Sequence, residues 1–142
     1  GTGAESNTIR IGNAGQTACY VTGIYGQTAS EDVFVMVGAD GHLGTITSSK
    51  KFKEDIKDMA GASAELRKLH PVTFRYKPEY EATGRIQYGL IAEEVQETCP
   101  DLVVYDKDGK PYTVRYNQLI PMLVNEYQQQ QHKINNAYND IL

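Results

Sequence analysis

The chain has 142 residues, which is enough for one ordinary domain, or for one compact domain with an extension. Its 14 Lys and Arg residues against 18 Asp and Glu residues give a formal net charge of −4, and this balance excludes the strongly basic surface typical of nucleic-acid binding. No apolar stretch has the length of a membrane span, and residues 1–8 lack the pattern of a signal peptide. We therefore expect a soluble protein with no membrane or nucleic-acid partner.

The cysteines and histidines form no metal-binding pattern. Cys19 and Cys99 lie in separate segments without a CxxC pair, and the histidines have no ligand spacing with each other or with the cysteines. We expect two free thiols in a reducing compartment, no metal site and no cofactor.

Residues 8–47 alternate short apolar runs with turn residues, which predicts strands rather than helices. The pair Asp40-Gly41, between apolar runs at 33–37 and 43–46, is typical of a tight β-hairpin. The segment has too few large apolar residues to close a core alone. We expect it to pack against copies of itself or against the following domain.

From residue 52 onward the apolar residues recur at intervals of four and three, which predicts a helix, interrupted near Gly61 and ended by Pro71. One face of this helix would carry Phe52, Ile56, Met59, Ser63 and Leu66. The following residues predict a strand at 72–76, a polar loop at 77–84, a strand at 87–92, a short helix at 93–98, and a hairpin whose strands are 102–105 and 112–116.

The last residues predict a long helix over 117–142, with Asn117 as N-cap and Pro121 tolerated in the first turn. The spacing of its apolar positions is that of a coiled-coil seam with two tyrosines, which favours three strands over two. The alternative is a helix that lies on its own domain. The predicted seam consists of Ile120, Val124, Tyr127, Gln131, Ile134, Tyr138 and Ile141.

Ser48 precedes Lys53 by five residues at the junction between the β-rich and the helical segments. A serine hydroxyl becomes a nucleophile when a base removes its proton, and a lysine amine can be that base where burial or neighbouring cations favour its neutral form. On spacing alone the signal is weak. A solvated helix start with Ser48 or Ser49 as N-cap is the simpler interpretation.

Four motifs follow one another along the chain: 44–56 (GTITSSKKFKEDI), 69–77 (LHPVTFRYK), 88–96 (YGLIAEEVQ) and 116–120 (YNQLI). In this order they resemble the self-cleaving C-terminal intramolecular chaperone domain of bacteriophage tailspikes and tail fibres. Endosialidase tailspikes are its best-known members, and the cleavage region of the myelin regulatory factor is similar. The order of the motifs is more specific than any one of them.

The resemblance implies an α+β fold with two parts. Residues 1–47 would be the end of a β-structured, fibrous stalk, and residues 48–142 would be a small mixed α/β domain, the intramolecular chaperone. The C-terminal helix of that domain, at 117–142, would form a trimeric coiled coil.

The resemblance also implies a site. Ser48 would be the nucleophile and Lys53 its general base, and the cut would fall between Thr47 and Ser48. Ser49 remains a weaker candidate for the nucleophile, because it stands where some members of the family carry an aspartate or asparagine.

The implied function is that of a chaperone with single-turnover serine autoprotease activity. It would drive homotrimerisation and folding of the fibre part of its own chain, and then release itself. Assembly would take place in the host cytoplasm, with the fibre part retained in the virion and the chaperone part released. A permanent trimerisation cap that never cuts is the alternative. A ligand-binding or multi-turnover enzyme domain has the least support, since the sequence shows no phosphate loop, metal cluster or paired carboxylates.

Overall fold

The computed structural model describes residues 7–9, 11–12 and 15–141. The chain divides into two units, Gly1–Phe34 and Val35–Leu142, and each is described by itself. In the described residues of the first unit there is no helix or strand, so the strands predicted before Val35 are not observed. A strand requires a second backbone to pair with its N–H and C=O groups, and the alternating sequence pattern cannot supply one.

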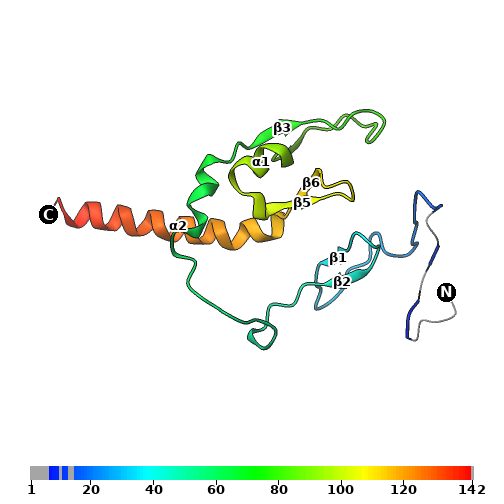
Figure 1. Ribbon diagram of the computed structural model, residues 1–142, viewed down its shortest axis with the longest axis horizontal. Coiled ribbons are helices and arrows are strands. Elements are labelled where there is room, and N and C mark those ends of the chain that lie inside the picture. The colour runs from blue at the N-terminus through cyan, green and yellow to red at the C-terminus, as the bar shows by residue number, and fades with distance from the viewer. Residues whose placement is uncertain (1–6, 10, 13–14, 142) are drawn as a thin grey trace. The chain divides into compact units, whose positions relative to one another are not determined.

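The hairpin predicted around Asp40-Gly41 is confirmed (Figure 1). Its strands β1 (Val35–Val37) and β2 (Leu43–Thr45) pair antiparallel. Gly41, in the connecting loop, has a φ of 82°, a left-handed conformation that glycine adopts without a steric penalty.

The single helix predicted from Phe52 is wrong. The chain instead forms a short 3₁₀ turn, η1 (Lys50–Phe52), then irregular backbone, then a longer 3₁₀ helix, η2 (Ala60–Lys68). Asp55 and Ala60 have φ values of 50° and 47°, and these left-handed conformations cannot continue a right-handed helix. Of the predicted apolar face, Phe52 and Ile56 are exposed, Met59 is half-buried, and only Ser63 and Leu66 are buried.

The middle of the second unit follows the predicted order of elements, with strands shorter than predicted. Two further antiparallel hairpins flank the short helix α1, and each makes a separate two-stranded sheet. These elements are β3 (Val72–Phe74), β4 (Gln87–Gly89), α1 (Ala92–Thr98), the 3₁₀ turn η3 (Pro100–Leu102), β5 (Val103–Tyr105) and β6 (Pro111–Val114).

One small core holds η2, α1, the β5–β6 hairpin and the C-terminal helix together. Leu66 of η2 and Leu119 of the C-terminal helix belong to the same core, so the two helices are bound to one apolar cluster. The buried apolar residues are Leu66, Val95, Cys99, Leu102, Val103, Val114 and Leu119.

The long C-terminal helix is α2 (Tyr116–Asn139), coloured orange to red in Figure 1. The predicted N-cap is wrong, because the capping position is Arg115, without a side-chain capping bond, and Asn117 lies inside the first turn. Pro121 lies within the helix, where its missing N–H leaves one backbone hydrogen bond unmade. The predicted C-terminal end also differs: Ile141 lies beyond the helix, and residue 142 lies outside the described residues.

α2 has two different faces. At about 100° per residue, Leu119, Met122 and Glu126 share one face, which packs on the domain core. The predicted seam lies on another face and is exposed, and it consists within α2 of Ile120, Val124, Tyr127, Gln131, Ile134 and Tyr138. The helix therefore lies on its own domain and still leaves the predicted seam free, whereas a partner for that seam stays a prediction.

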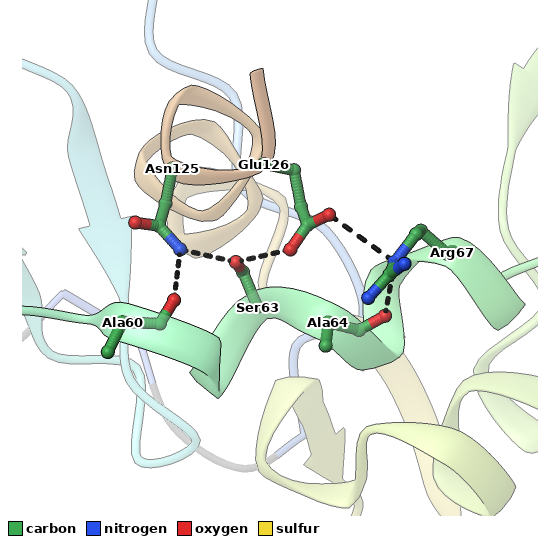
Figure 2. Close-up of polar contacts among 6 residues, drawn as sticks. All are labelled: Ala60, Ser63, Ala64, Arg67, Asn125 and Glu126. Carbon is green, nitrogen blue, oxygen red and sulfur yellow. Dashed lines mark hydrogen bonds and ion pairs between the residues drawn. The ribbon is translucent and has the colours of Figure 1, made fainter. Parts of the chain in front are cut away.

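A buried polar network joins α2 to η2 (Figure 2). Ser63 is fully buried, and its hydroxyl donates to Oε1 of Glu126 at 2.8 Å and accepts from Nδ2 of Asn125 at 2.6 Å. The same Nδ2 also donates to the carbonyl oxygen of Ala60 at 2.8 Å. Nε of Arg67 lies 3.4 Å from Oε2 of Glu126. Each of these buried polar groups has a partner, which stabilises one particular docking of α2 on η2.

The loop between β3 and β4 is held by a local carboxylate contact. Hydrogen bonds from the side chain and then the backbone of Thr83 lower the pKa of Glu81, and the backbone N–H lies 2.6 Å from Oε1. A lowered pKa in the folded state means that this contact stabilises the fold above the unfolded-state pKa, and that its contribution is lost as the pH falls through the folded-state pKa.

Gly89, the last residue of β4, lies against the start of α2. A Cβ at this position would lie 2.9 Å from Oη of Tyr116 and 3.2 Å from Cε1 of Phe74. Oη of Tyr116 also accepts the backbone N–H of Leu90 at 3.0 Å, so the tyrosine has little freedom to move away.

We predict that Gly89→Ala lowers the free energy of unfolding by about 1–3 kcal/mol, because the added methyl group overpacks this contact. Urea denaturation at one fixed protein concentration measures the change. Gly44→Ala is the matched control, since Gly44 is also a strand residue and a Cβ there meets nothing within 4 Å. Equal midpoints for the two variants would show that the contact between β4 and α2 is loose.

We also predict that Ser63→Ala lowers the free energy of unfolding by about 1–3 kcal/mol, because it leaves buried groups of Asn125 and Glu126 without their partner. The same denaturation experiment measures it, with the exposed Ser30→Ala as control. A variant as stable as the wild type would mean that water replaces the lost hydroxyl at no cost.

Candidate functional site

The structure places the side chains of Ser48 and Lys53 in contact. Nζ of Lys53 donates a hydrogen bond to Oγ of Ser48 at 3.2 Å. The backbone of η1 brings them together, because the N–H groups of Phe52 and Lys53 bond to the carbonyls of Ser49 and Lys50 at 3.0 and 3.1 Å. This tight turn folds the chain back, so that two side chains five residues apart meet.

Both side chains line one open hollow of about 550 Å³. Its lining residues are Ser48, Lys50, Lys53, Asp55 and Ile56, all of them exposed. Water therefore reaches the hydroxyl and the amine. In the observed contact the lysine is the donor, whereas a general base has to accept the serine proton.

The neighbouring residues are placed differently. Nζ of Lys51 lies 4.8 Å from the ring centroid of Phe52 and so faces an aromatic ring. Ser49 occupies the capping position of η1 without a side-chain capping bond, and no hydrogen bond joins it to Lys53 in the described part of the chain. Thr47, the residue before Ser48, is exposed. Of the two adjacent serines, the structure brings only Ser48 to the lysine.

Residues 7–9, 11–12 and 15–141 contain no group of three or more His, Cys, Asp or Glu side chains able to hold a metal ion. In the same residues no helix has the length and apolarity that a membrane span needs.

Sequence reasoning gave no role to Asn125, Glu126 or Arg67. In the structure Asn125 and Glu126 of α2 contact Ser63 of η2, and Arg67 of η2 pairs with Glu126 (Figure 2). On a helix with a predicted seam, polar residues between the seam positions are ordinary and carry no signal of burial. The sequence carries one signal of this network: Ser63 is a polar residue on a predicted helix face whose other residues are apolar.

Fold and site together define a small α+β domain with an exposed hydroxyl–amine pair at its N-terminal side. Residues 48–104 match the model of the family Peptidase_S74, described as chaperone of endosialidase. Over these residues the match confirms the resemblance seen in the sequence. The match begins at Ser48, contains Lys53 and ends before α2. No curated protein matches the chain.

Proposed function

We propose that this chain is an intramolecular chaperone that cuts itself once, between Thr47 and Ser48, after three copies have assembled. The observation that carries the proposal is the 3.2 Å contact between Lys53 and Ser48 inside a segment that matches a chaperone family. The family match supports the chaperone role, and the contact supports the choice of these two side chains for the chemistry.

The proposed reaction proceeds in two stages. Oγ of Ser48 attacks the carbonyl carbon of Thr47, and Lys53 accepts the hydroxyl proton. The proton then passes to the amide nitrogen of Ser48, the C–N bond breaks, and Thr47 is left as an ester on Oγ. Water adds to this ester and releases the Thr47 carboxylate, which leaves Ser48 with a free amine and its hydroxyl restored. Because nucleophile and carbonyl are adjacent, proximity supplies up to about 7–11 kcal/mol of the barrier when the geometry is right.

Assembly supplies what the exposed site lacks. Lys53 has to be neutral to accept a proton, and removal of water disfavours the charged amine. The exposed apolar seam on α2 is the surface through which we propose that three chains associate, with Gln131 and the tyrosines favouring three strands. Burial of the site on association would then start the reaction.

In this function the chaperone domain acts on the rest of its own chain. Holding three chains together raises the local concentration of their N-terminal segments and removes much of the entropic cost of aligning them. After the cut, the assembled fibre loses its easy route back to separate chains. We propose that assembly occurs in the host cytoplasm, and that the fibre part stays in the virion while the chaperone part leaves.

We predict that freshly expressed wild-type protein gives two fragments on a denaturing gel, and that N-terminal sequencing of the larger fragment, residues 48–142, begins at Ser48. Ser48→Ala is expected to give one band. Lys53→Ala is expected to cut at least about 100-fold more slowly while it still forms trimers, since a general base contributes that much or more.

Ser49→Ala is the matched control for these variants, and we expect it to cut like the wild type. Loss of cutting in Ser49→Ala with cutting retained in Ser48→Ala would move the nucleophile by one residue. A wild type that forms trimers and never cuts would instead identify a permanent trimerisation cap.

We predict that Ile134→Asn lowers trimer content and cutting together, because it removes an apolar side chain from the centre of the exposed seam. Sedimentation and gel analysis of the same samples measure both quantities. Lys133→Asn, an exposed neighbour on another face of α2, is the control. Trimers retained at wild-type level in Ile134→Asn would show that the chains associate elsewhere.

A further inference from the structure

The first residue of η2, Ala60, has a backbone conformation that needs external support. Its φ is 47°, a left-handed value that a residue with a Cβ rarely adopts. Such conformations persist where surrounding contacts hold them, and they are common where a chain direction matters for function. Ala60 is exposed, so apolar packing does not supply that support.

Asn125 of α2 supplies a contact of the right kind. Its Nδ2 donates one hydrogen bond to the carbonyl oxygen of Ala60 at 2.8 Å and one to Oγ of Ser63 at 2.6 Å, so both amide protons are used (Figure 2). Ser63 is itself fixed by Glu126. The amide of Asn125 therefore links the backbone of Ala60 to a side chain that is fully buried and hydrogen-bonded.

Ala60 also lies at a particular place in the chain. It follows Lys53 by seven residues, and the residues between them form no helix or strand. Within the described residues, Ala60 is the first position after the Ser48–Lys53 pair whose backbone is held by a hydrogen bond from α2. Ala60 is therefore the point at which α2 contacts the backbone that leads to the Ser48–Lys53 pair.

We infer that Asn125 is a positioning residue for the self-cleavage reaction. By holding Ala60 in its left-handed conformation, it makes the geometry of the Ser48–Lys53 segment depend on the docking of α2, in addition to the association of three chains. This inference rests on the proposed function, and it adds a second condition to it. Trimers whose α2 is present but does not hold Ala60 cut slowly.

The test compares cutting rates of the full 142-residue chain, measured on isolated trimers. Asn125→Ala is expected to cut about 10- to 100-fold more slowly than the wild type, as expected for a small misplacement of reacting groups. Asn136→Ala is the matched control, since Asn136 is exposed and lies eleven residues along α2, on the same side of the helix at about 100° per residue. We expect it to cut like the wild type.

Rescue separates a positioning role from a general structural one. Ala60→Gly relieves the left-handed conformation, because glycine adopts it freely. Adding Ala60→Gly to Asn125→Ala is expected to restore most of the lost rate, whereas loss of the Ser63 contact alone would not be repaired by a change at residue 60. A double variant as slow as Asn125→Ala would overturn the inference.

A second variant covers the case in which Asn125→Ala trimers do not form. Ala60→Val leaves α2 unaltered and disfavours the left-handed conformation, so its trimers are expected to cut slowly, and a wild-type rate would overturn the inference. If wild-type trimers cut and Asn125→Ala trimers cut equally fast, the inference fails while the proposed function stands. If wild-type trimers never cut, the proposed function itself fails.

Discussion

The hydrogen bond from the buried hydroxyl of Ser63 to Glu126 determines how α2 docks on the rest of the domain. Burying a hydroxyl and a carboxylate is unfavourable unless both are paired, so any other register of α2 on η2 would leave buried polar groups without partners. The 3₁₀ geometry of η2 fits this requirement. At about three residues per turn, Ala60, Ser63 and Leu66 lie along one edge of η2. Toward α2 this edge presents the carbonyl of Ala60, the hydroxyl of Ser63 and the apolar side chain of Leu66.

Docking by this edge leaves the other face of α2 unoccupied. The domain uses Leu119, Met122 and Glu126 for its own core and network, while the seam residues from Ile120 to Tyr138 stay in solvent. On the proposed function, folding of one chain and association of three therefore do not compete for the same residues. A row of large apolar side chains on one helix face is unfavourable in water, and on the proposed function this row is the surface through which the chains associate.

The sequence predicted those elements whose signals are local. The pair Asp40-Gly41 is by itself enough to predict a turn. Pro71 likewise predicts the end of a helix independently of the surrounding structure. The helix expected from Phe52 failed because left-handed Asp55 and Ala60 break it, and the Ala60 conformation coincides with a contact from Asn125, 65 residues away. The strands expected before Val35 are not observed in the described residues, since an alternating pattern predicts the two faces of a strand but not the strand that pairs with it. The spacing and the order of motifs predicted the Ser48–Lys53 pair, but they did not predict the turn that brings the two side chains together.

The orientation of the contact between Lys53 and Ser48 connects the site to the assembly. In the exposed hollow the amine donates to the hydroxyl, which is the reverse of what proton abstraction requires. Lys50 and Asp55 line the same hollow, so a cationic and an anionic side chain both lie beside the pair. Removal of water would strengthen electrostatic interactions in the hollow and make burial of a charged amine unfavourable. On the proposed function, the Ser48–Lys53 pair is inactive and the seam is exposed for the same reason: the neighbouring chains are absent. Association of three chains would bury the seam and remove water from the pair in one step.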